Sequence, residues 1–196
     1  MKAAGIDLAG VATRPTGFCL LDEQLRARTR ILRNDDEILA VTIESHPGVV
    51  AIDAPLALPR GRESLSVRSD VHLRECDRAL LRMGIKFFPL TLGPMRQLTE
   101  RGMRLKATLE SRGMTAIETY PGAAQDILHI PRKGKGLDGL RDGLTGLGIR
   151  ALRPGMTGDE LDAVTCALVG LLYLKKQHLA IGDPDEMLMV LPKPTA

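Results

Sequence analysis

Aromatic residues are scarce in this chain, and tryptophan is absent. Phenylalanine and tyrosine together make up 3% of the 196 residues. Proteins that hold single-stranded nucleic acid usually stack the bases on aromatic side chains. The composition therefore argues against a nucleic-acid surface that reads bases by stacking.

Cysteine is also rare, and no CxxC pair occurs. The three cysteines, Cys19, Cys76 and Cys166, are far apart in the sequence. A zinc ribbon needs paired cysteines, and a disulfide framework usually needs an even number of them. None of the four histidines has the spacing of a metal ligand. We therefore expect a reduced, cytoplasmic protein in which Cys76 and Cys166 are packing residues.

Long hydrophobic runs are missing as well. A helix that crosses a bilayer needs ~20 apolar residues, and the longest run here, over 163–174, predicts a buried helix instead. The chain begins with a strand pattern rather than with the cationic leader of a signal peptide. With 44% apolar and 26% charged residues and a net charge of +3, we expect one globular domain over residues 1–196 without a membrane partner.

The hydrophobic pattern predicts an α/β fold. An antiparallel meander is expected first, followed by a helix over 35–45 that Asn34 caps. Buried strands then alternate with helices. The five predicted strands cover 2–9, 16–22, 26–32, 49–52 and 115–118, and later helices begin at 121 and at 157 or 158. This order predicts a mixed sheet with helices on both faces.

A basic segment over residues 60–112 interrupts this order after the fourth strand. It contains 12 basic and 6 acidic residues, and helices are predicted over 70–83 and 95–111. Arg74, Arg78 and Arg82 recur along one helix stripe, and Lys86 follows. Such a stripe can bind phosphates, although solvated helix faces often look the same. At the other end of the chain, the apolar stretch 187–191 is a candidate edge strand or an interface of an oligomer.

Four short acidic motifs form the clearest functional signal. They are GIDLAG with Asp7, VVAIDAP with Asp53, AIETYPG with Glu118, and GDELDAV with Asp159 and Asp162. The first three follow apolar strands, and the last opens an apolar helix. A buried carboxylate is costly unless it is paired or bound to metal. Convergence of these acids would create a site for divalent cations and phosphoryl chemistry.

Each acid also has a structural interpretation. Asp7 and Asp53 could instead form backbone turns after their strands. Glu118 could bind metal, orient a water or pair with a basic residue of the insertion. Acids in the first turn of a helix favour its dipole, which would explain Asp159. Asp162 shares its helix stripe with buried apolar residues and is expected to point inward. Glu160, on another face, is expected to be solvated.

In this order, the segments GIDLAG, AIDAPLALP, RECDRALLRMGIKFFP, IETYPGA and ELDAVTCALVG resemble the DUF429 family from Gly5 to about Tyr173. That family is described as predicted nucleases with a ribonuclease H-like fold. The resemblance implies Mg²⁺ or Mn²⁺ as cofactor. It also implies catalytic roles for Asp7, Asp53, Glu118 and Asp162, and metal ligation by Asp7, Asp53, Asp159 and Asp162.

The chain also resembles Holliday-junction resolvases of the RuvC type. Those proteins have a GIDPG-like first strand, an acid on the fourth strand and a D-x-x-D pair on the last helix, which match Asp7, Asp53, Asp159 and Asp162. Leu8-Ala9 departs from the proline-containing pattern, and both Glu118 and the basic insertion lie outside it. A branched junction as substrate is therefore not implied.

Three functions remain as hypotheses from the sequence. The first is a metal-dependent nuclease that uses a two-metal mechanism, with Arg74, Arg78 and Lys86 as substrate-binding residues. Its partner would be nucleic acid or a phosphorylated small molecule. The second is a phosphotransferase related to actin and the sugar kinases, which share this strand order but need two such domains. The third is a non-catalytic module that binds nucleic acid or protein.

Overall fold

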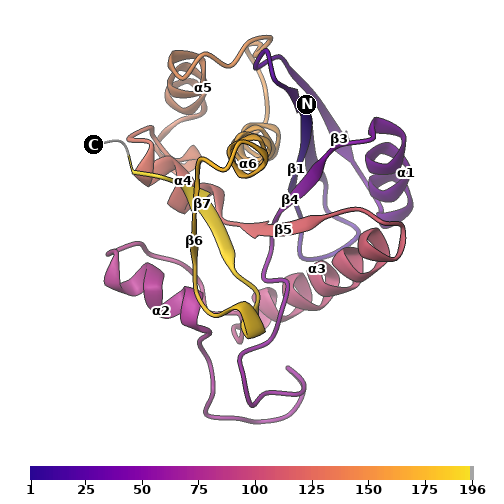
Figure 1. The fold of residues 1–196 in the computed structure, drawn as a ribbon, viewed down its shortest axis with the longest axis vertical. Helices are drawn as coiled ribbons and strands as arrows, with labels where there is room; N and C mark the ends of the chain where they lie inside the picture. The colour runs from indigo at the N-terminus through magenta and orange to yellow at the C-terminus, as the bar shows by residue number, and fades with distance from the viewer. Residues whose placement is uncertain (195–196) are drawn as a thin grey trace.

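Within residues 1–194, the part of the chain that a computed structural model describes, one mixed β-sheet forms the centre of the fold (Figure 1). Its seven strands are β1 (Lys2–Asp7), β2 (Thr16–Asp22), β3 (Ala27–Leu32), β4 (Val49–Asp53), β5 (Ala116–Thr119), β6 (His178–Ile181) and β7 (Met189–Pro192). They lie in the order β3-β2-β1-β4-β5-β7-β6. β1 pairs antiparallel with β2 and parallel with β4, so the sheet changes direction at its middle.

Helices cover both faces of this sheet. They are α1 (Asp35–Ser45), α2 (Glu75–Arg82), α3 (Gly93–Ser111), α4 (Pro121–Ile127), α5 (Leu137–Gly146) and α6 (Gly158–Leu174), with short 3-10 helices η1 (Lys133–Lys135) and η2 (Pro184–Glu186). α6 packs on one face, and α1 and α3 pack on the other (Figure 1). No helix in residues 1–194 is long and apolar enough to span a bilayer. The predicted α/β architecture with a ribonuclease H-like order is confirmed.

The number of strands differs from the prediction of five, because the C-terminal segment adds β6 and β7. β7 pairs with β5 through Glu118 and Met189, and it pairs antiparallel with β6. Met189, Val190 and Leu191 are all buried. The strand expected in the apolar stretch 187–191 is therefore present as β7, but its expected place at the edge is wrong, since β7 has a neighbour on each side and β6 forms the edge. An oligomer interface at this stretch stays a prediction.

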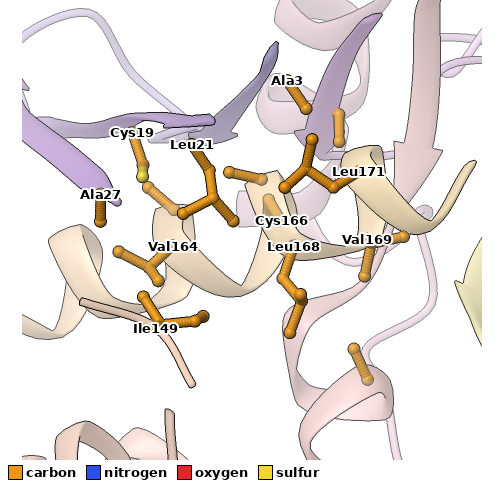
Figure 2. Packing of buried hydrophobic residues seen from close by; sticks show 14 of the residues in the cluster. Ala3, Cys19, Leu21, Ala27, Ile149, Val164, Cys166, Leu168, Val169 and Leu171 are labelled. Carbon is orange, nitrogen blue, oxygen red and sulfur yellow. The ribbon is translucent and has the colours of Figure 1, made fainter. Parts of the chain in front are cut away.

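Alternation along the strands divides the core into two parts. Ala3 and Val49 face α6 and pack with residues such as Val164 and Leu171. Figure 2 shows this cluster, in which Cys19 and Leu21 of β2 point toward α6, whereas Leu168 lies on the side of that helix turned away from the strands. The intervening residues of the strands face the other way, and they pack with α1 and α3. This alternation therefore decides which face of the sheet the last side chain of each strand points to.

Two glycines allow α6 to lie unusually close to the sheet. A Cβ atom on Gly5 would lie 2.1 Å from the carbonyl oxygen of Ala163, and one on Gly17 would lie 2.0 Å from that of Asp159. Real Cβ atoms do not approach backbone atoms this closely, so larger residues would push the helix away. This close approach places the N-terminal turn of α6 against the end of β1 and the start of β2.

Polar residues fix where the predicted helices begin. Asn34 caps α1 as expected, accepting a hydrogen bond of 2.9 Å from the Glu37 amide. Thr157 caps α6 in a capping box with Glu160. The expectation that Glu160 is solvated is wrong: it is buried and also accepts hydrogen bonds of 2.8 Å from Thr29 and Arg153. It ties the first turn of α6 to β3.

The basic segment over 60–112 contains α2 and α3, although its first 15 residues form irregular structure. α2 begins at Glu75, later than the predicted 70, because Arg74 is extended and caps it. Cys76 and Leu80 anchor α2 against Leu191 of β7. The segment is thus attached at the carboxyl end of the parallel strands, which is also the edge where Asp7 and Asp53 lie.

Candidate active site

Asp7 and Asp53 end two adjacent parallel strands. β1 and β4 pair in a register that sets Asp7 directly opposite Asp53. Register partners in a sheet project their side chains to the same face. Both carboxyl groups therefore leave the sheet toward α6, at the edge where α/β proteins place their sites.

The first turns of α6 bring two further acids to the same place. Asp162 is buried, as expected from its position on the helix, and its Oδ1 accepts a hydrogen bond of 2.7 Å from Gln125 of α4. Asp159, one turn earlier, keeps 39% of its side chain exposed. The same Gln125 amide contacts Thr165 at 3.2 Å, which fixes its orientation. The structure thus brings together all four predicted metal ligands from β1, β4 and α6.

A lysine that sequence reasoning missed occupies the middle of this acidic cluster. The Nζ atom of Lys133 lies 2.7 Å from Oδ2 of Asp162, 3.3 Å from Oδ2 of Asp7 and 3.6 Å from Oδ1 of Asp159. Its side chain is 44% exposed, so the ammonium reaches the acids from the solvent side. One cation therefore bridges three carboxylates from two elements, β1 and α6.

The sequence offers little warning of this lysine. Lys133 lies in the stretch Pro131–Gly136, where glycines and basic residues alternate, a pattern typical of a solvated loop. In the structure this stretch forms η1 and packs against the start of α6, because Gly158 leaves room for it: a Cβ atom there would lie 3.1 Å from Cδ of Lys133. The one usable signal is a cluster of three basic residues directly after the helix that follows β5.

Burial and mutual repulsion shift the titration of these acids. Burial raises the pKa of Asp7 from 3.8 to about 7, with Lys133 opposing the shift and Asp162 adding to it. Burial also raises the pKa of Asp53 well above its ordinary value, and the charge of Asp7 raises it further. Burial alone would lower the pKa of Lys133, but the carboxylates of Asp7 and Asp162 more than offset this and raise it. Asp7 and Asp53 therefore keep their protons to a higher pH than an exposed aspartate does.

Glu118 does not join this cluster. β5 pairs with β4 so that Glu118 lies opposite Ile52, whereas Asp53 lies opposite Thr119. A shift of one residue sends a side chain to the other face of the sheet. Glu118 consequently points away from α6, and its carboxylate lies among the irregular loop after β4 and the cap of α2.

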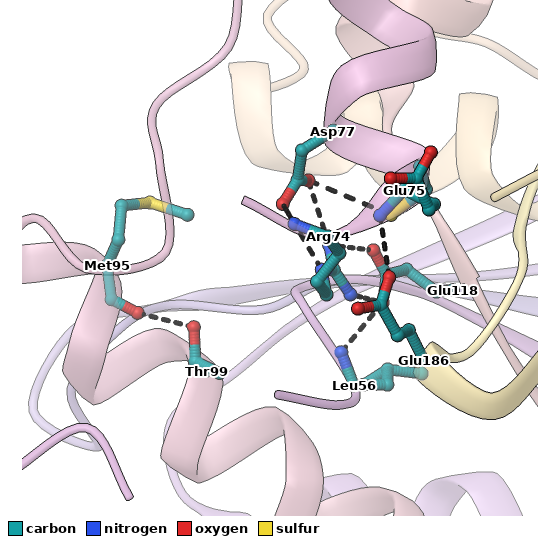
Figure 3. A network of polar contacts seen from close by, with 9 residues as sticks. Leu56, Arg74, Glu75, Asp77, Met95, Thr99, Glu118 and Glu186 are labelled. Carbon is teal, nitrogen blue, oxygen red and sulfur yellow. Dashed lines mark hydrogen bonds and ion pairs between the residues drawn. The ribbon is translucent and has the colours of Figure 1, made fainter. Parts of the chain in front are cut away.

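Arg74 holds Glu118 in a buried ion pair. Two parallel hydrogen bonds of 2.7 Å join Nη1 and Nη2 of Arg74 to the two carboxylate oxygens of Glu118. Figure 3 shows Arg74 between Asp77 and Glu118. Oε2 of Glu118 also accepts a hydrogen bond of 2.7 Å from the Leu56 amide. Glu186 contacts the start of α2, where its carboxylate accepts a hydrogen bond of 2.6 Å from the Glu75 amide. Glu118 was expected to bind metal, orient a water or pair with a basic residue of the insertion. The structure shows the third arrangement, with Arg74 as the partner.

The predicted arginine stripe is only partly formed. Arg74 is 1% exposed and faces carboxylates, because it precedes the helix and its extended backbone turns it inward. Its expected place on an exposed phosphate-binding stripe is therefore wrong. Arg78 is exposed on α2 and pairs with Glu75 at 2.9 Å. Lys86 is exposed in the loop after α2, beside Phe87 and Phe88.

A cavity of about 440 Å³ opens beside the acidic cluster. Asp53 and Asp162 lie at one end of it, and η1 forms part of its rim. Its walls come from α2, α3, the loop between them and the start of α4. The lining includes Phe87, Phe88, Met95, Leu98, Tyr120, Arg132, Lys133 and Lys135. A volume of this size falls in the range of small-molecule sites, roughly 300–1,000 Å³.

The donor set fits a hard divalent cation. Asp7, Asp53, Asp159 and Asp162 offer oxygen ligands alone, which Mg²⁺ and Mn²⁺ prefer. The raised pKa values of Asp7 and Asp53 arise first from burial, and a cation bound beside these acids would favour their ionised forms. In the present arrangement, however, no three His, Cys, Asp or Glu side chains within residues 1–194 converge closely enough to hold a metal ion. Lys133 lies between them. Binding of a cation therefore requires this lysine and the carboxylates to move.

The order of elements and the sheet define a protein with a ribonuclease H-like fold. The chain matches the family model described as "Protein of unknown function (DUF429)" over residues 5–186 and belongs to that family. No curated protein matches it.

Two solved structures are similar to this chain. The first is of "T. thermophilus RuvC in complex with Holliday junction substrate". It has a TM-score of 0.52 and 16% sequence identity, and the match covers 90% of this chain and 96% of that one. The second is of Thermus thermophilus RuvC without a stated ligand, with a TM-score of 0.46, 14% identity and the same coverage. At such identity the likeness shows the fold.

Proposed function

We propose that the protein is a metal-dependent nuclease that cleaves phosphodiester bonds at the acidic cluster. One observation carries this proposal: four carboxylates from β1, β4 and α6 lie near one another at the carboxyl edge of the parallel strands, three of them within 3.6 Å of the Lys133 ammonium. A fold without a functional need would not bury two acids side by side at such a cost in desolvation. The similarity to the RuvC fold supports a nuclease by analogy.

Asp7, Asp53, Asp159 and Asp162 would hold Mg²⁺ or Mn²⁺. When bound, such cations lower the pKa of an attacking water and neutralise charge on the phosphodiester. Asp7 ends β1, which is paired with a strand on each side, so its backbone is well fixed for holding such a cation. Gln125 fixes the orientation of Asp162 through its 2.7 Å hydrogen bond.

Lys133 would exchange partners during the reaction. Its ammonium bonds to Asp7 and Asp162 in the free protein, and it can turn toward a phosphate oxygen once other cations neutralise those carboxylates. Lys135 lies on the same rim of the cavity, and so does Arg132. These three side chains would contact phosphate groups, which confer affinity without sequence preference.

Glu118 and Arg74 would have a positioning role in the same site. Their ion pair, together with the Leu56 amide, holds the loop that follows Asp53 against the cap of α2. Arg78 and Lys86 remain proposed contacts for the nucleic-acid backbone, because both are exposed and Lys86 lines a hollow together with Phe87 and Phe88. The partner proposed here is nucleic acid, with a phosphorylated small molecule as the narrower alternative.

The direct test is cleavage of labelled DNA and RNA in single-stranded, duplex and branched form, with Mg²⁺ or Mn²⁺. Wild type is compared with Asp7→Asn and with Asp36→Asn, a control acid exposed on α1. We expect Asp7→Asn to lose at least about 100-fold in rate, as when a group that stabilises transition-state charge is removed. Asp36→Asn should cleave like wild type. Equal cleavage by wild type and Asp7→Asn would disprove the proposal.

A second candidate is a binding module that does not cleave. The observation in its favour is Lys133, whose ammonium already neutralises part of the cluster. Such a module would bind nucleic acid equally well in EDTA and in Mg²⁺, and neutralising Asp7 would not weaken that binding. Metal-dependent stabilisation of wild type that Asp7→Asn abolishes would exclude it.

A further inference from the structure

The few aromatic residues of this chain are gathered beside the acidic cluster. The sequence contains three phenylalanines, two tyrosines and no tryptophan. Three of these five, Phe87, Phe88 and Tyr120, line the cavity of about 440 Å³ that ends at Asp53 and Asp162. Aromatic residues are therefore rare in the whole chain but not at this cavity.

Phe88 is the most exposed of the large apolar side chains that the described residues present. It is 72% exposed at the cavity mouth, in the loop between α2 and α3. It also lines an adjoining hollow that contains Lys86 and Arg132. An aromatic ring left in water next to cationic side chains is the usual arrangement of a surface that stacks a base and contacts its backbone.

Tyr120 forms the fixed side of the same cavity. Its hydroxyl donates a hydrogen bond of 2.9 Å to the carbonyl of Lys86, and Nη1 of Arg132 donates to it at 3.0 Å. The guanidinium of Arg132 also lies 5.5 Å from the centre of the Tyr120 ring. This network ties the loop that carries Phe87 and Phe88 to the helix start at Pro121, so the aromatic wall is held in place before any ligand binds.

Apolar and cationic side chains also line this cavity. Met95 and Leu98 of α3 are among the apolar ones, and Lys133 and Lys135 are among the cationic ones, with Lys133 in contact with Asp7 and Asp162. A ligand that fits must therefore present a flat apolar body to the interior and negative charge to the rim. A nucleobase with its flanking phosphate has this combination, whereas an aliphatic or purely anionic ligand lacks one half of it.

We propose that the cavity receives one unpaired nucleobase whose flanking phosphate lies over the acidic cluster. The inference rests on the proposed function and specifies its substrate: a strand with at least one base free of pairing, since a base within a duplex cannot enter a recess without leaving the stack. Phe88 would stack on this base, and Lys133 and Lys135 would contact the phosphate.

Binding of two matched single strands tests this inference. Both are fluorescein-labelled oligonucleotides of about ten nucleotides, a length within the usual site size, and one has abasic sugars at every position. Titrations are done with Ca²⁺ present, an oxygen-seeking cation that lets binding be measured apart from cleavage. The proteins are wild type, Phe88→Ala, Phe88→Tyr and Val67→Ala. Val67 is a matched control because its side chain is 66% exposed in the same insertion.

We expect wild type to bind the natural strand about 5- to 150-fold more tightly than the abasic strand, the range for loss of one stacked base. Phe88→Ala should lose most of this preference. Phe88→Tyr and Val67→Ala should keep it, because a tyrosine ring still stacks and Val67 lies outside the cavity. A duplex of the same sequence should bind like the abasic strand.

The outcomes separate this inference from the proposed function. Equal binding of the natural and abasic strands, or a preference that Phe88→Ala retains, overturns the base pocket even if cleavage still depends on Asp7. Failure of wild type to bind either strand overturns both the pocket and the choice of nucleic acid as substrate. Cleavage that is lost in Asp7→Asn while the preference depends on Phe88 supports both.

Discussion

Asp7 of β1 and Asp53 of β4 are direct register partners on adjacent parallel strands, and both carboxyl groups leave the sheet on the face covered by α6. Burial of the Asp7 carboxyl group opposes its ionisation and raises its pKa from 3.8 to about 7, and the charges of Asp162 and Asp159 add to this rise. Burial likewise raises the pKa of Asp53, and the charge of Asp7 raises it further. The cluster costs stability, which is the expected price of a preorganised anionic site.

This cost predicts a specific pH dependence for Asp7→Asn. Between pH 3.8 and about 7, folded Asp7 keeps a proton that the unfolded chain releases, so the acid destabilises the fold increasingly as pH rises, and fully above about pH 7. In EDTA, the melting temperature of Asp7→Asn relative to wild type should therefore increase from pH 5 to pH 8, by at least about 2 °C. Thermal unfolding at both pH values measures this, and a pH-independent difference would contradict it.

Lys133→Met should separate metal binding from catalysis. Without the ammonium at 2.7 Å from Asp162, cations meet no internal competitor, so Mn²⁺ should bind about fivefold more tightly, in line with an ion pair worth roughly 1 kcal/mol. Cleavage should nevertheless slow by about tenfold or more, because a donor to the phosphate is lost. Calorimetric titration with Mn²⁺ measures the affinity.

The matched control for that variant is Lys135→Met, which removes the same charge from the same 3-10 helix. Lys135 forms no ion pair with the acids, among the described residues. Lys135→Met should therefore bind Mn²⁺ with an affinity close to that of wild type. If both variants changed this affinity equally, long-range charge rather than occupation of the cluster by Lys133 would explain the effect.

Gln125→Met tests whether the partner of Asp162 matters for the site. The variant keeps the length of the side chain but removes the 2.7 Å hydrogen bond to Oδ1 of Asp162. Loss of such an orienting contact to a metal ligand typically weakens metal binding by about 10- to 100-fold. Mn²⁺ titration should show this loss, whereas Gln97→Met on α3 should bind like wild type.

The Arg74–Glu118 pair predicts a strongly non-additive double-mutant cycle. Either Arg74→Met or Glu118→Gln leaves a buried group without its partner, which typically costs about 3–5 kcal/mol of unfolding free energy. The double variant should lose less than the sum of the two single losses, because neither charge remains unpaired. Urea denaturation of the four proteins measures the coupling, and additive losses would show that the pair contributes little.

Gly5→Ala should damage both stability and the site. The new Cβ would lie 2.1 Å from the carbonyl oxygen of Ala163 and 2.3 Å from the amide of Ala167, so α6 would have to shift. We expect a loss of several kcal/mol, at or above the usual 1–3 kcal/mol for overpacking, and weaker Mn²⁺ binding because Asp162 moves with the helix. Gly146→Ala, where the Cβ meets nothing within 4 Å, is the control and should be as stable as wild type.

Much of the fold follows from local patterns that the sequence displays. The meander, the capped helix after Asn34 and the buried strand before Asp53 each depend on alternation or on a single capping side chain, so their positions could be predicted. The apolar stretch of β7 also predicted a strand, but β6 and the place of β7 between β5 and β6 could not be predicted, because that pairing depends on distant strands. The polar role of Glu160 likewise depends on Thr29, which lies 131 residues away.

The same limit explains the site. Asp7, Asp53 and the α6 acids could be grouped because strand ends and helix starts meet at one sheet edge. Glu118 could not be separated from them, since a one-residue register shift decides its face and no sequence pattern records the register. Lys133 could not be added, because its position depends on the packing of η1 against α6. Register and long-range packing were the missing information.

The most direct test of the central claim is Mn²⁺ binding and nucleic-acid cleavage measured on the same samples of wild type, Asp7→Asn, Asp53→Asn and Asp162→Asn. If the acidic cluster is the metal-dependent active site, wild type binds Mn²⁺ and cleaves, and each variant loses both properties together. Cleavage that survives in Asp7→Asn, or Mn²⁺ binding that all three substitutions leave unchanged, would place the metal or the chemistry elsewhere and contradict the claim.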